Sequence, residues 1–527
     1  MKQTSLLLYG FLFIFTGSIS LQAQTKETYW GKLHGGVDAN AAFYKKDKDR
    51  PDLDTLGLNT YINLNYEYKK FNVGLQYELY EPPMRGYPKE LKGHKLMQYF
   101  AGYSGNNLSM TLGSFYEQFG SGLIFRSYEE RALGVNTSLR GMHIKYSPLD
   151  WMTFKALAGQ PRRYLEYADA ITYGADGDFI ISRLWNKEYT YNVTFGSSWI
   201  MRHNQKTYDA AVEPTTVNLF GVRTGFNNAH INIGLEYTSK GLSQSFSPIT
   251  GEYVNQRGDA LLLNMDYTRE GLGISGVFRR IEHMDFRVDN KPAQIYIPLN
   301  YIPALTKQHK YALPSLYPHV ANPEGEIGGQ MDIFWDVAPE WMGKYPMKFS
   351  LNASWYRSLG DNWMKTMPFW GKEGINLFRE TSLELGKRLN RNVKTNIGFY
   401  FQEKYESGKG NYKSFIEVID VLWRINRKIS LRSELQHMNT EMRDKAWLYG
   451  LIEFGLAPHW MVYVSDMHNY GADEKEHFFN IGAGYVHNSL RVSVTYGKNR
   501  EGLQCVGGVC RFVPGYTGAT FTLSYVF

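Results

Sequence analysis

The chain ends with Phe521-Thr522-Leu523-Ser524-Tyr525-Val526-Phe527. Large apolar side chains occupy every second position of this stretch, and the last residue is aromatic. Alternation with a period of two places one class of residue on each face of a β-strand. The stretch therefore predicts a final strand with one apolar face, formed by Phe521, Leu523, Tyr525 and Phe527.

The same alternation recurs from about Trp30 to the end of the chain, and two stretches joined by Lys69-Lys70 show it well. Their apolar positions are Ile62, Leu64, Tyr66, Tyr68, Val73, Leu75, Tyr77 and Leu79, and their polar positions are Asn63, Asn65, Glu67, Asn72, Gln76 and Glu78. Such stretches are joined in turn by short turns and by longer polar loops. Counting them predicts about 24 strands, uncertain by roughly two to four, with about 11 short turns.

The N-terminal segment indicates export. Met1-Lys2-Gln3-Thr4 is short and positive, residues 5–20 form an apolar run, and Leu21-Gln22-Ala23 puts a small residue before the next segment. This order is typical of a secretory signal peptide, and its apolar run is short for a membrane span. We expect residues 1–23 to be a signal peptide and residues 24–527 to form a single domain.

The remaining patterns indicate a membrane barrel. The mature chain has no run of the roughly 18 apolar residues that a membrane-spanning helix needs. The full sequence has 39 Tyr and 12 Trp residues, which favour membrane–water interfaces. A soluble β-sandwich would give the same alternation, but short periplasmic turns paired with long external loops are typical of transmembrane barrels. We therefore predict an all-β fold, a transmembrane antiparallel up-and-down β-barrel in the bacterial outer membrane.

This placement implies two partners. The first is outer-membrane lipid around the barrel. The second is the barrel-assembly machinery, which recognises a C-terminal strand with a terminal aromatic residue during biogenesis. Phe521, Leu523, Tyr525 and Phe527 match that assembly signal.

The two cysteines lie in Cys505-Val506-Gly507-Gly508-Val509-Cys510. In an exported chain a disulfide is the favoured interpretation, and the two glycines allow the tight turn that it needs. A loop this small suggests a stabilisation of only about 2 kcal/mol, so the bond shapes one loop rather than holding the fold. A redox-active pair is the alternative. The predicted topology places this loop outside, in the last external connection.

Two other loops carry candidate functional residues. The longest, residues 282–324, is rich in proline, which excludes central strands, and in tyrosine. The second, residues 115–135, leads into a group of charges that we expect to form an ionic network in the lumen, because such charges avoid lipid but still need partners. The group consists of Arg126, Glu129, Glu130, Arg131 and Arg140. It is either a strut that ties an inward-folded loop to the wall or an anion-selective constriction, and Arg162-Arg163 could join either arrangement.

Catalytic and cofactor motifs are missing from the sequence. It contains no Gly-x-Ser-x-Gly elbow, Walker loop or dinucleotide fingerprint. Its net charge of +7 comes without the basic block that nucleic-acid binding would need. The densest ionisable group is Asp466, His468, Glu474, Glu476 and His477, for which a solvated external loop is the favoured explanation and a divalent-metal site the alternative. We expect no enzyme activity, cofactor, metal or nucleic-acid partner.

Several motifs resemble an uncharacterised family of large outer-membrane barrels typical of Bacteroidota, a domain of unknown function. The residues that carry the resemblance are Cys505-Val506-Gly507-Gly508-Val509-Cys510-Arg511, Pro514, Gly120-Ser121-Gly122-Leu123, Arg126 and the closing strand. The resemblance covers nearly all of the mature chain. It implies location and fold, and it implies no activity.

Three functions fit these patterns. The polar inward face favours a porin-like channel or transporter for polar solutes. The alternative is a non-conducting scaffold or subunit of an envelope or secretion assembly, which would contact other envelope proteins through its long external loops. An outer-membrane hydrolase is the third hypothesis, and it has the least support because the sequence offers no catalytic arrangement.

Overall fold

The computed structural model describes residues 30–527 apart from 47–52, 186–187, 189, 207–213, 247–252, 292–296, 338–342, 361–366, 443–444 and 507–508. The predicted signal peptide, residues 1–23, lies outside the described residues. In the described part of the chain, no helix is long and apolar enough to cross a membrane.

Long strands build one wall, and short elements lie in the connections between them. The wall strands are β1 (Lys32–Tyr44), β2 (Leu56–Tyr68), β3 (Phe71–Tyr80), β4 (Gly93–Ser104), β5 (Leu108–Phe115), β10 (Leu139–Leu149), β11 (Met152–Arg163), β13 (Ala170–Ile180), β14 (Tyr191–Asn204), β15 (Thr216–Asn228), β16 (Ile231–Phe246), β17 (Tyr253–Arg269), β18 (Leu272–Glu282), β19 (Gly325–Val337), β20 (Met347–Ser358), β21 (Asn376–Arg388), β22 (Val393–Glu406), β23 (Gly410–Arg424), β24 (Ile429–Thr440), β25 (Ala446–Leu456), β26 (Trp460–Asn469), β27 (Glu476–His487), β28 (Leu490–Asn499) and β31 (Tyr516–Val526). The short elements are β6 (Gln118–Phe119), β7 (Phe125–Arg126), β8 (Glu129–Glu130), β9 (Val135–Asn136), β12 (Glu166–Tyr167), β29 (Gly502–Val506), β30 (Val509–Val513) and the 3-10 turns η1 (Lys89–Leu91), η2 (Arg131–Leu133) and η3 (Ile181–Leu184).

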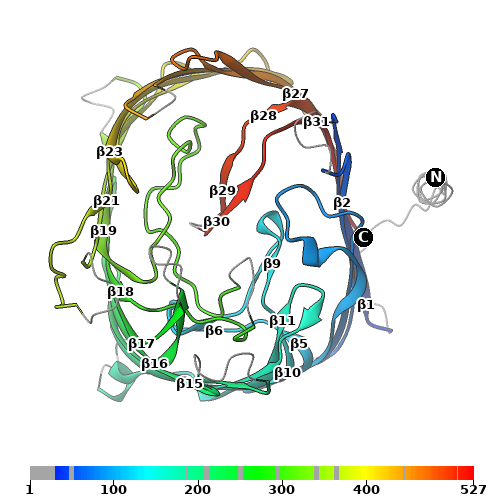
Figure 1. Cartoon of the computed structure of the whole chain (residues 1–527), viewed down its shortest axis with the longest axis vertical. Helices are drawn as coiled ribbons and strands as arrows, with labels where there is room; N and C mark the ends of the chain where they lie inside the picture. The colour runs from blue at the N-terminus through cyan, green and yellow to red at the C-terminus, as the bar shows by residue number, and fades with distance from the viewer. Residues whose placement is uncertain are drawn as a thin grey trace.

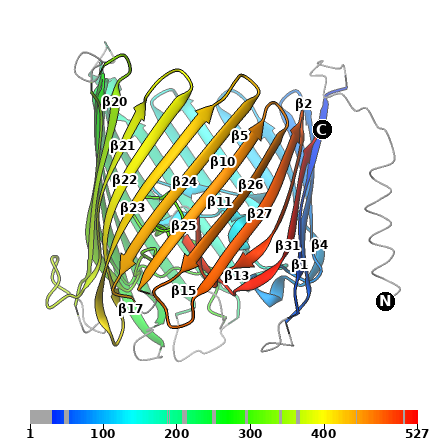
Figure 2. The ribbon, with the colours of Figure 1, turned by 90° about the horizontal axis from the view of Figure 1, so that it is seen from above.

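The wall strands form one closed antiparallel sheet (Figure 1). The sheet has 25 strands, of which 24 belong to the wall. The remaining strand, the two-residue β12, pairs only with the end of β11. β1 pairs with β2 on one side and with β31 on the other, so the last strand closes the barrel on the first. The predicted antiparallel barrel of 24 strands is confirmed. Figure 2 shows the strands inclined to the barrel axis, as closure requires.

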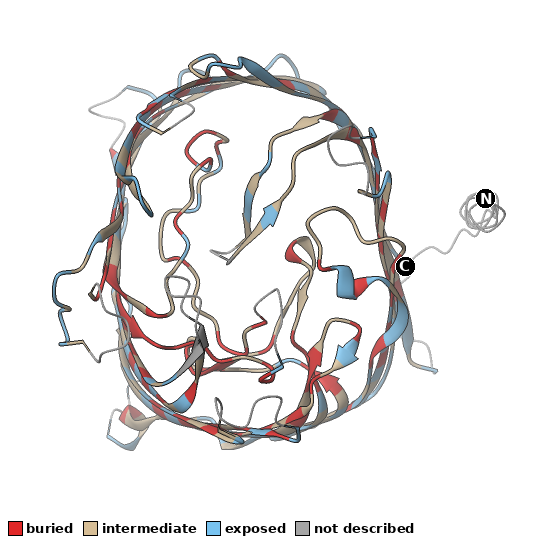
Figure 3. Ribbon diagram, in the orientation of Figure 1, coloured by how far each residue is buried: buried red, intermediate tan, exposed pale blue. Residues whose placement is uncertain are grey.

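Side chains alternate between the outer face and the lumen. In β2, Ile62 is 45% exposed on the outer face, whereas its neighbour Tyr61 is 2% exposed on the inner one. In β3, Leu75 is exposed outside and Glu78 is buried inside. Figure 3 shows that many of the buried residues lie where luminal segments meet the wall. An apolar outer face over a fully hydrogen-bonded closed sheet is what a membrane-spanning barrel requires.

The two ends of the barrel differ. One end of the barrel is the end at which β1 starts and β31 stops. Eleven connections between the described wall strands lie there, and this number agrees with the predicted number of short turns. Lys69-Lys70, between β2 and β3, is one of the tightest. The opposite, external end carries the long connections, including residues 116–138, 283–324 and 500–515.

The seam between β1 and β31 closes the barrel. Its register runs from Gly36 opposite Val526 to Tyr44 opposite Gly518. Beyond it, Phe527 exchanges two backbone hydrogen bonds of 2.9 Å with Gly35. A Cβ atom on Gly35 would lie 2.7 Å from Cζ of the Phe527 ring, so the missing side chain makes room for the terminal aromatic.

We predict that Phe527→Ala lowers the fraction of barrel that folds, because it removes a ring contact at the seam worth about 2 kcal/mol. Heat-modifiable migration of outer-membrane fractions in SDS gels measures the folded fraction. Thr522→Ala, an exposed position of the same strand, is the matched control. Equal folded fractions for the two variants would contradict a role of the ring in closure and assembly.

Candidate functional site in the barrel lumen

Three long external connections fold into the barrel (Figure 1). We call residues 116–138 the first inward loop, residues 283–324 the second inward loop and residues 500–515 the luminal hairpin. The connection of residues 81–92, between β3 and β4, joins them, although the sequence did not single it out. A lumen inside 24 strands is wide, and apolar loop residues gain more by burial inside it than by exposure to water.

The prediction that the Cys505–Cys510 loop lies outside the barrel is wrong. It leaves the wall at the external end, as predicted, but it lies inside the lumen rather than outside. Strand alternation fixes the end of the barrel at which a loop emerges. It carries no information about the direction in which the loop then folds.

Glu117 anchors the first inward loop to the wall. Its carboxylate accepts a hydrogen bond of 2.9 Å from Lys155 of β11 and lies 2.7 Å from Nε2 of His143 of β10. Burial raises the pKa of Glu117, but the contacts with His143 and Lys155 outweigh burial and lower it to about 2. The apolar residues of the loop that join the cluster on the inner wall are Phe119, Leu123, Ile124 and Phe125.

Part of the expected ionic network comes together, with partners from the wall. Arg131 donates to Asp38 of β1 at 2.7 Å and to Glu129 at 3.1 Å. Glu129 also accepts a hydrogen bond of 2.9 Å from Gln76 of β3. Glu130 instead caps the first turn of η2 with its carboxylate. Glu129 and Arg131 thus tie the first inward loop to two wall strands, which is the geometry of a strut.

Arg126 and Arg140 lie outside this network and contact aromatic rings instead. The guanidinium carbon of Arg126 is 3.8 Å from the ring centroid of Tyr301 and 5.0 Å from that of Tyr128. Arg140 lies 3.9 Å over Tyr167. A guanidinium over an aromatic face is stabilised by the negative charge density of the ring. Of the five residues, Glu129 and Arg131 therefore form the strut, Arg126 and Arg140 make separate cation–π contacts, and Glu130 caps η2.

A buried ion pair that sequence patterns did not identify supports the same side of the lumen. Arg162 donates two hydrogen bonds of 2.6 Å to Glu78, and each side chain is 1% exposed. The hydroxyl of Tyr80 donates to the same carboxylate at 3.0 Å. Removing one partner of such a pair costs about 3–5 kcal/mol, because the other charge stays buried. Two features of the sequence could have suggested this ion pair. Strand alternation places Glu78 on the inner face, and Arg162-Arg163 supplies a cation that needs a partner.

The second inward loop is fastened at both sides of the lumen. At its base, backbone hydrogen bonds join His283 to Glu324 at 3.2 Å and Met284 to Pro323 at 3.0 Å. Farther along, Lys404 of β22 donates to the Pro318 carbonyl at 2.6 Å. The loop residues Tyr311, Leu313 and Leu316 pack there on the wall residues Tyr400, Ile416, Met438 and Trp447.

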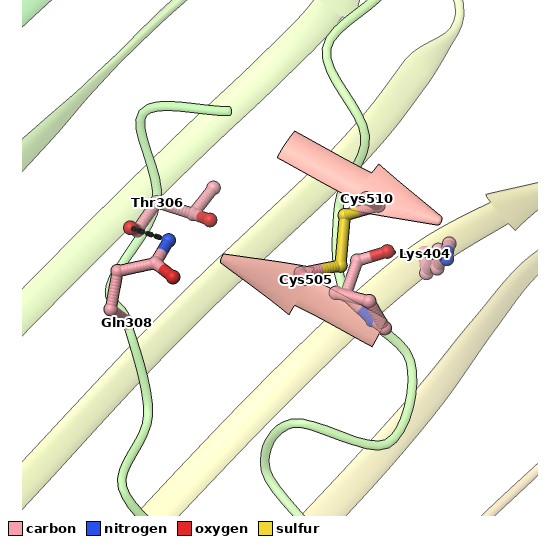
Figure 4. Close-up of a disulfide and its surroundings, with 6 residues drawn as sticks. Thr306, Gln308, Lys404, Cys505 and Cys510 are labelled. Atoms are coloured by element: carbon pink, nitrogen blue, oxygen red, sulfur yellow. Dashed lines mark hydrogen bonds between the residues drawn. A yellow bond between two sulfur atoms is a disulfide. The ribbon is translucent and has the colours of Figure 1, made fainter. Parts of the chain in front are cut away.

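The luminal hairpin consists of β29 and β30. Cys505 and Cys510 face each other in its register, 4.0 Å apart between Cα atoms, and form the expected disulfide. Figure 4 shows Thr306 and Gln308 of the second inward loop and Lys404 of the wall around this bond. The predicted turn glycines, residues 507–508, lie outside the described residues.

A cavity of about 630 Å³ lies where these segments meet. Both inward loops, the connection 81–92 and the luminal hairpin contribute to its lining, together with wall residues. The tyrosines that line it are Tyr61, Tyr80, Tyr128, Tyr164 and Tyr301, and the arginines are Arg131, Arg162, Arg287 and Arg511. Clefts of this size, with aromatic walls and a few fixed polar groups, are the usual form of small-molecule sites.

Two of these tyrosines are suited to donate hydrogen bonds into the cavity. Burial raises the pKa of Tyr128 and of Tyr164 to about 12, so both hydroxyls are protonated at physiological pH. Tyr164 also has a φ of 55°, in the left-handed region that non-glycine residues seldom adopt. Arg162 holds this backbone by donating to the Tyr164 carbonyl at 2.6 Å. Backbone strain of this kind gathers at functional sites.

The histidine group of the sequence lies away from the cavity. The rings of His468 and His477 stack with centroids 3.9 Å apart, and Nδ1 of His477 lies 2.6 Å from Asp466. Glu476 instead pairs with Lys498 at 2.8 Å. Across the described ranges, no three His, Cys, Asp or Glu side chains are placed to hold a metal ion.

The fold and the lumen define the class, an outer-membrane β-barrel whose lumen is occupied by its own loops. Residues 1–527 match the family described as "Family of unknown function (DUF6029)", and the chain belongs to that family. The resemblance to an uncharacterised barrel family is thereby confirmed. No curated protein matches the chain.

Three of the solved structures that match the chain are a pilus assembly intermediate, an usher pore and a siderophore receptor. The E. coli P pilus tip assembly intermediate PapC-PapD-PapK-PapG has a TM-score of 0.50 at 9% identity, covering 96% of this chain and 62% of that one. The P pilus usher PapC translocation pore has a TM-score of 0.46 at 9% identity, covering 94% and 99%. The siderophore receptor PirA from Pseudomonas aeruginosa has a TM-score of 0.43 at 10% identity, covering 94% and 80%. At these identities the likeness concerns the fold alone.

We predict that Glu117→Gln loosens the first inward loop at neutral pH. The pKa of this carboxyl is lower in the folded state than in the unfolded chain, so its contribution is present above the ordinary value near 4.5 and is lost as pH falls toward about 2. The shift corresponds to roughly 3 kcal/mol. Limited proteolysis within residues 116–138 should therefore proceed faster in the variant at pH 7, and the difference should shrink between pH 5 and pH 2.

Glu166→Gln is the matched control, because Glu166 is an exposed residue of β12. A difference between Glu117→Gln and the unaltered protein that stays constant down to pH 2 would contradict the assignment of the anchor.

Proposed function

We propose that the protein is a channel or transporter that carries small polar solutes across the outer membrane through a lumen restricted by its own loops. The observation that supports this function is the position of the cavity. It lies inside the lumen, between the inner wall and four inward-folded segments. A solute moving through the external half of the barrel would meet it.

The inner wall supports the same function. Its polar residues in β2 and β3 include Asn59, Asn63, Asn65, Asn72, Gln76 and Glu78. A polar interior behind an apolar outer face is typical of barrels that conduct water-soluble molecules. The inward loops distinguish this barrel from an open porin, because ion pairs such as that of Arg163 in β11 with the buried Asp289 of the second inward loop, at 2.6 Å, hold them in place.

The scaffold hypothesis relied on the long loops as contact surfaces for envelope partners. Residues 116–138, 283–324 and 500–515 are turned into the lumen, which removes most of that surface. A partner would have to use other external segments. The connection between β20 and β21 is a candidate among the described residues, because Phe369 and Trp370 are exposed there.

The hydrolase hypothesis gains no support from the lumen. Its buried histidine–carboxylate pairs, such as His319–Glu326 at 2.9 Å, fasten the second inward loop. We assign these pairs a structural role.

We predict that replacing residues 501–514 by a short Gly-Ser linker raises single-channel conductance in planar bilayers several-fold, because the hairpin then no longer narrows the lumen. Replacing the external connection 470–475, which does not line the cavity, is the matched control and should leave conductance unchanged. Heat-modifiable migration verifies folding of both variants. Electrical silence of the folded hairpin variant would overturn the channel and favour the non-conducting scaffold.

A further inference from the structure

The arginines of the cavity differ in how their charge is balanced. Three of them form ion pairs within the protein: Arg131 with Asp38 and Glu129, Arg162 with Glu78, and Arg287 with Asp285. These three guanidiniums therefore have their counter-ions already. Arg511 of the luminal hairpin is different, because no carboxylate of the described residues lies within ion-pair distance of it.

The position of Arg511 makes this imbalance costly. Its guanidinium lies 3.8 Å from the ring centroid of Tyr87, and one nitrogen, Nη2, donates to Gln504 at 3.2 Å. Its Nε and Nη1 atoms are buried and donate to no acceptor among the described residues. Burial lowers the pKa of Arg511, but an arginine stays charged at any physiological pH. Arg511 as a whole is half-buried, and two of its guanidinium nitrogens have lost water without gaining an acceptor, which favours a bound counter-ion.

A second guanidinium adds positive charge beside the cavity. Arg126 stacks on Tyr301 and Tyr128, both of which line the cavity, and neither contact brings a negative group. The other polar groups that face this space include the neutral hydroxyls of Tyr128 and Tyr164, which can donate hydrogen bonds. Three carboxylates also line the cavity, and each already has a partner: Glu129 lies against Arg131, Asp285 against Arg287 and Glu324 against His283. The hydroxyls of Tyr128 and Tyr164 and two nitrogens of Arg511 therefore remain donors without an acceptor among the described residues.

The remaining lining is largely apolar. It includes Leu91, Leu133, Ile297, Ile302, Val320 and Phe512. A strongly hydrated inorganic ion alone would leave these surfaces unfilled, whereas a molecule with an apolar or aromatic body would cover them. The volume of about 630 Å³ suits a small organic molecule.

We propose that the cavity binds a small organic anion, whose carboxylate or phosphate group pairs with Arg511 while its apolar body lies against Phe512 and the tyrosines. This inference rests on the proposed function, because it names the class of solute that the channel recognises. A guanidinium binds two oxygens of a carboxylate or phosphate through Nη2 together with either Nε or Nη1. In Arg511, Nη2 donates one of its two N–H groups to Gln504, and its other N–H stays available for such a fork.

The test measures binding to the full-length barrel in detergent with three probes. Naphthalene-2-carboxylate and 2-naphthyl phosphate carry the two anionic groups on one aromatic body, and naphthalene-2-carboxamide is their neutral counterpart. Isothermal titration calorimetry gives each Kd. We expect at least one anion to bind about ten-fold or more tightly than the carboxamide, and the preferred anion identifies the natural head group.

Variants locate the site. Arg511→Gln should weaken binding of the preferred anion about ten-fold or more and leave carboxamide binding unchanged. Arg427→Gln, an exposed arginine in the turn between β23 and β24, is the matched control and should bind like the unaltered protein. The comparison of anion with carboxamide on the unaltered protein needs no variant, so it tests the inference even if Arg511→Gln folds poorly.

Equal affinity for the anions and the carboxamide, absence of binding for both anions, or full anion affinity in folded Arg511→Gln would each overturn the inference. The outcome is separate from that of the bilayer experiment. A barrel that discriminates the anion but conducts in no variant overturns the proposed channel. A conducting barrel that binds all three probes equally overturns the anion site alone.

Discussion

The structure depends on closing a β-sheet so that no backbone hydrogen-bonding group faces lipid. In hydrocarbon each unpaired N–H or C=O costs several kcal/mol, so an open sheet edge is excluded. The pairing of β31 with β1 removes both edges at once. Closure explains the even number of strands, the outward apolar set that includes Ile62, and the position of Phe527 against Gly35.

Closure of so many strands creates a second constraint, because it encloses a lumen too wide for wall side chains to fill. The chain fills the external part with its own connections. These connections are held by ion pairs between loop and wall residues that are largely shielded from water, as in Glu117 with Lys155 and Asp289 with Arg163. Buried charges of this kind tolerate little displacement, since a lost partner leaves the other unpaired. The cavity is the space between segments fixed in this way, and Arg511 is the guanidinium on its lining that they leave unbalanced.

Much of the fold follows from local sequence patterns, and the site follows from them only in part. Alternation from Ile62 to Leu79 gave the correct faces of β2 and β3, and the spacing of Cys505 and Cys510 gave the disulfide. Within the expected ionic network, Glu129 and Arg131 are two residues apart and do meet. Their further partner Asp38 lies 93 positions from Arg131, and Glu78 lies 84 positions from Arg162, so neither pair could be found by spacing. Arg126 and Arg140 were grouped with the network by proximity in sequence, yet they contact tyrosine rings.

The sequence by itself determined that this chain forms a membrane barrel, about how many strands it has, where its long connections leave the wall and which side chains face outward. These properties depend on a period of two along each strand, which is local. The tertiary structure alone decided that three long connections turn inward, that the Cys505–Cys510 hairpin lies in the lumen, which charges are paired and where a cavity is left. These properties depend on contacts between residues far apart in the chain, and such residues become neighbours only when the sheet closes.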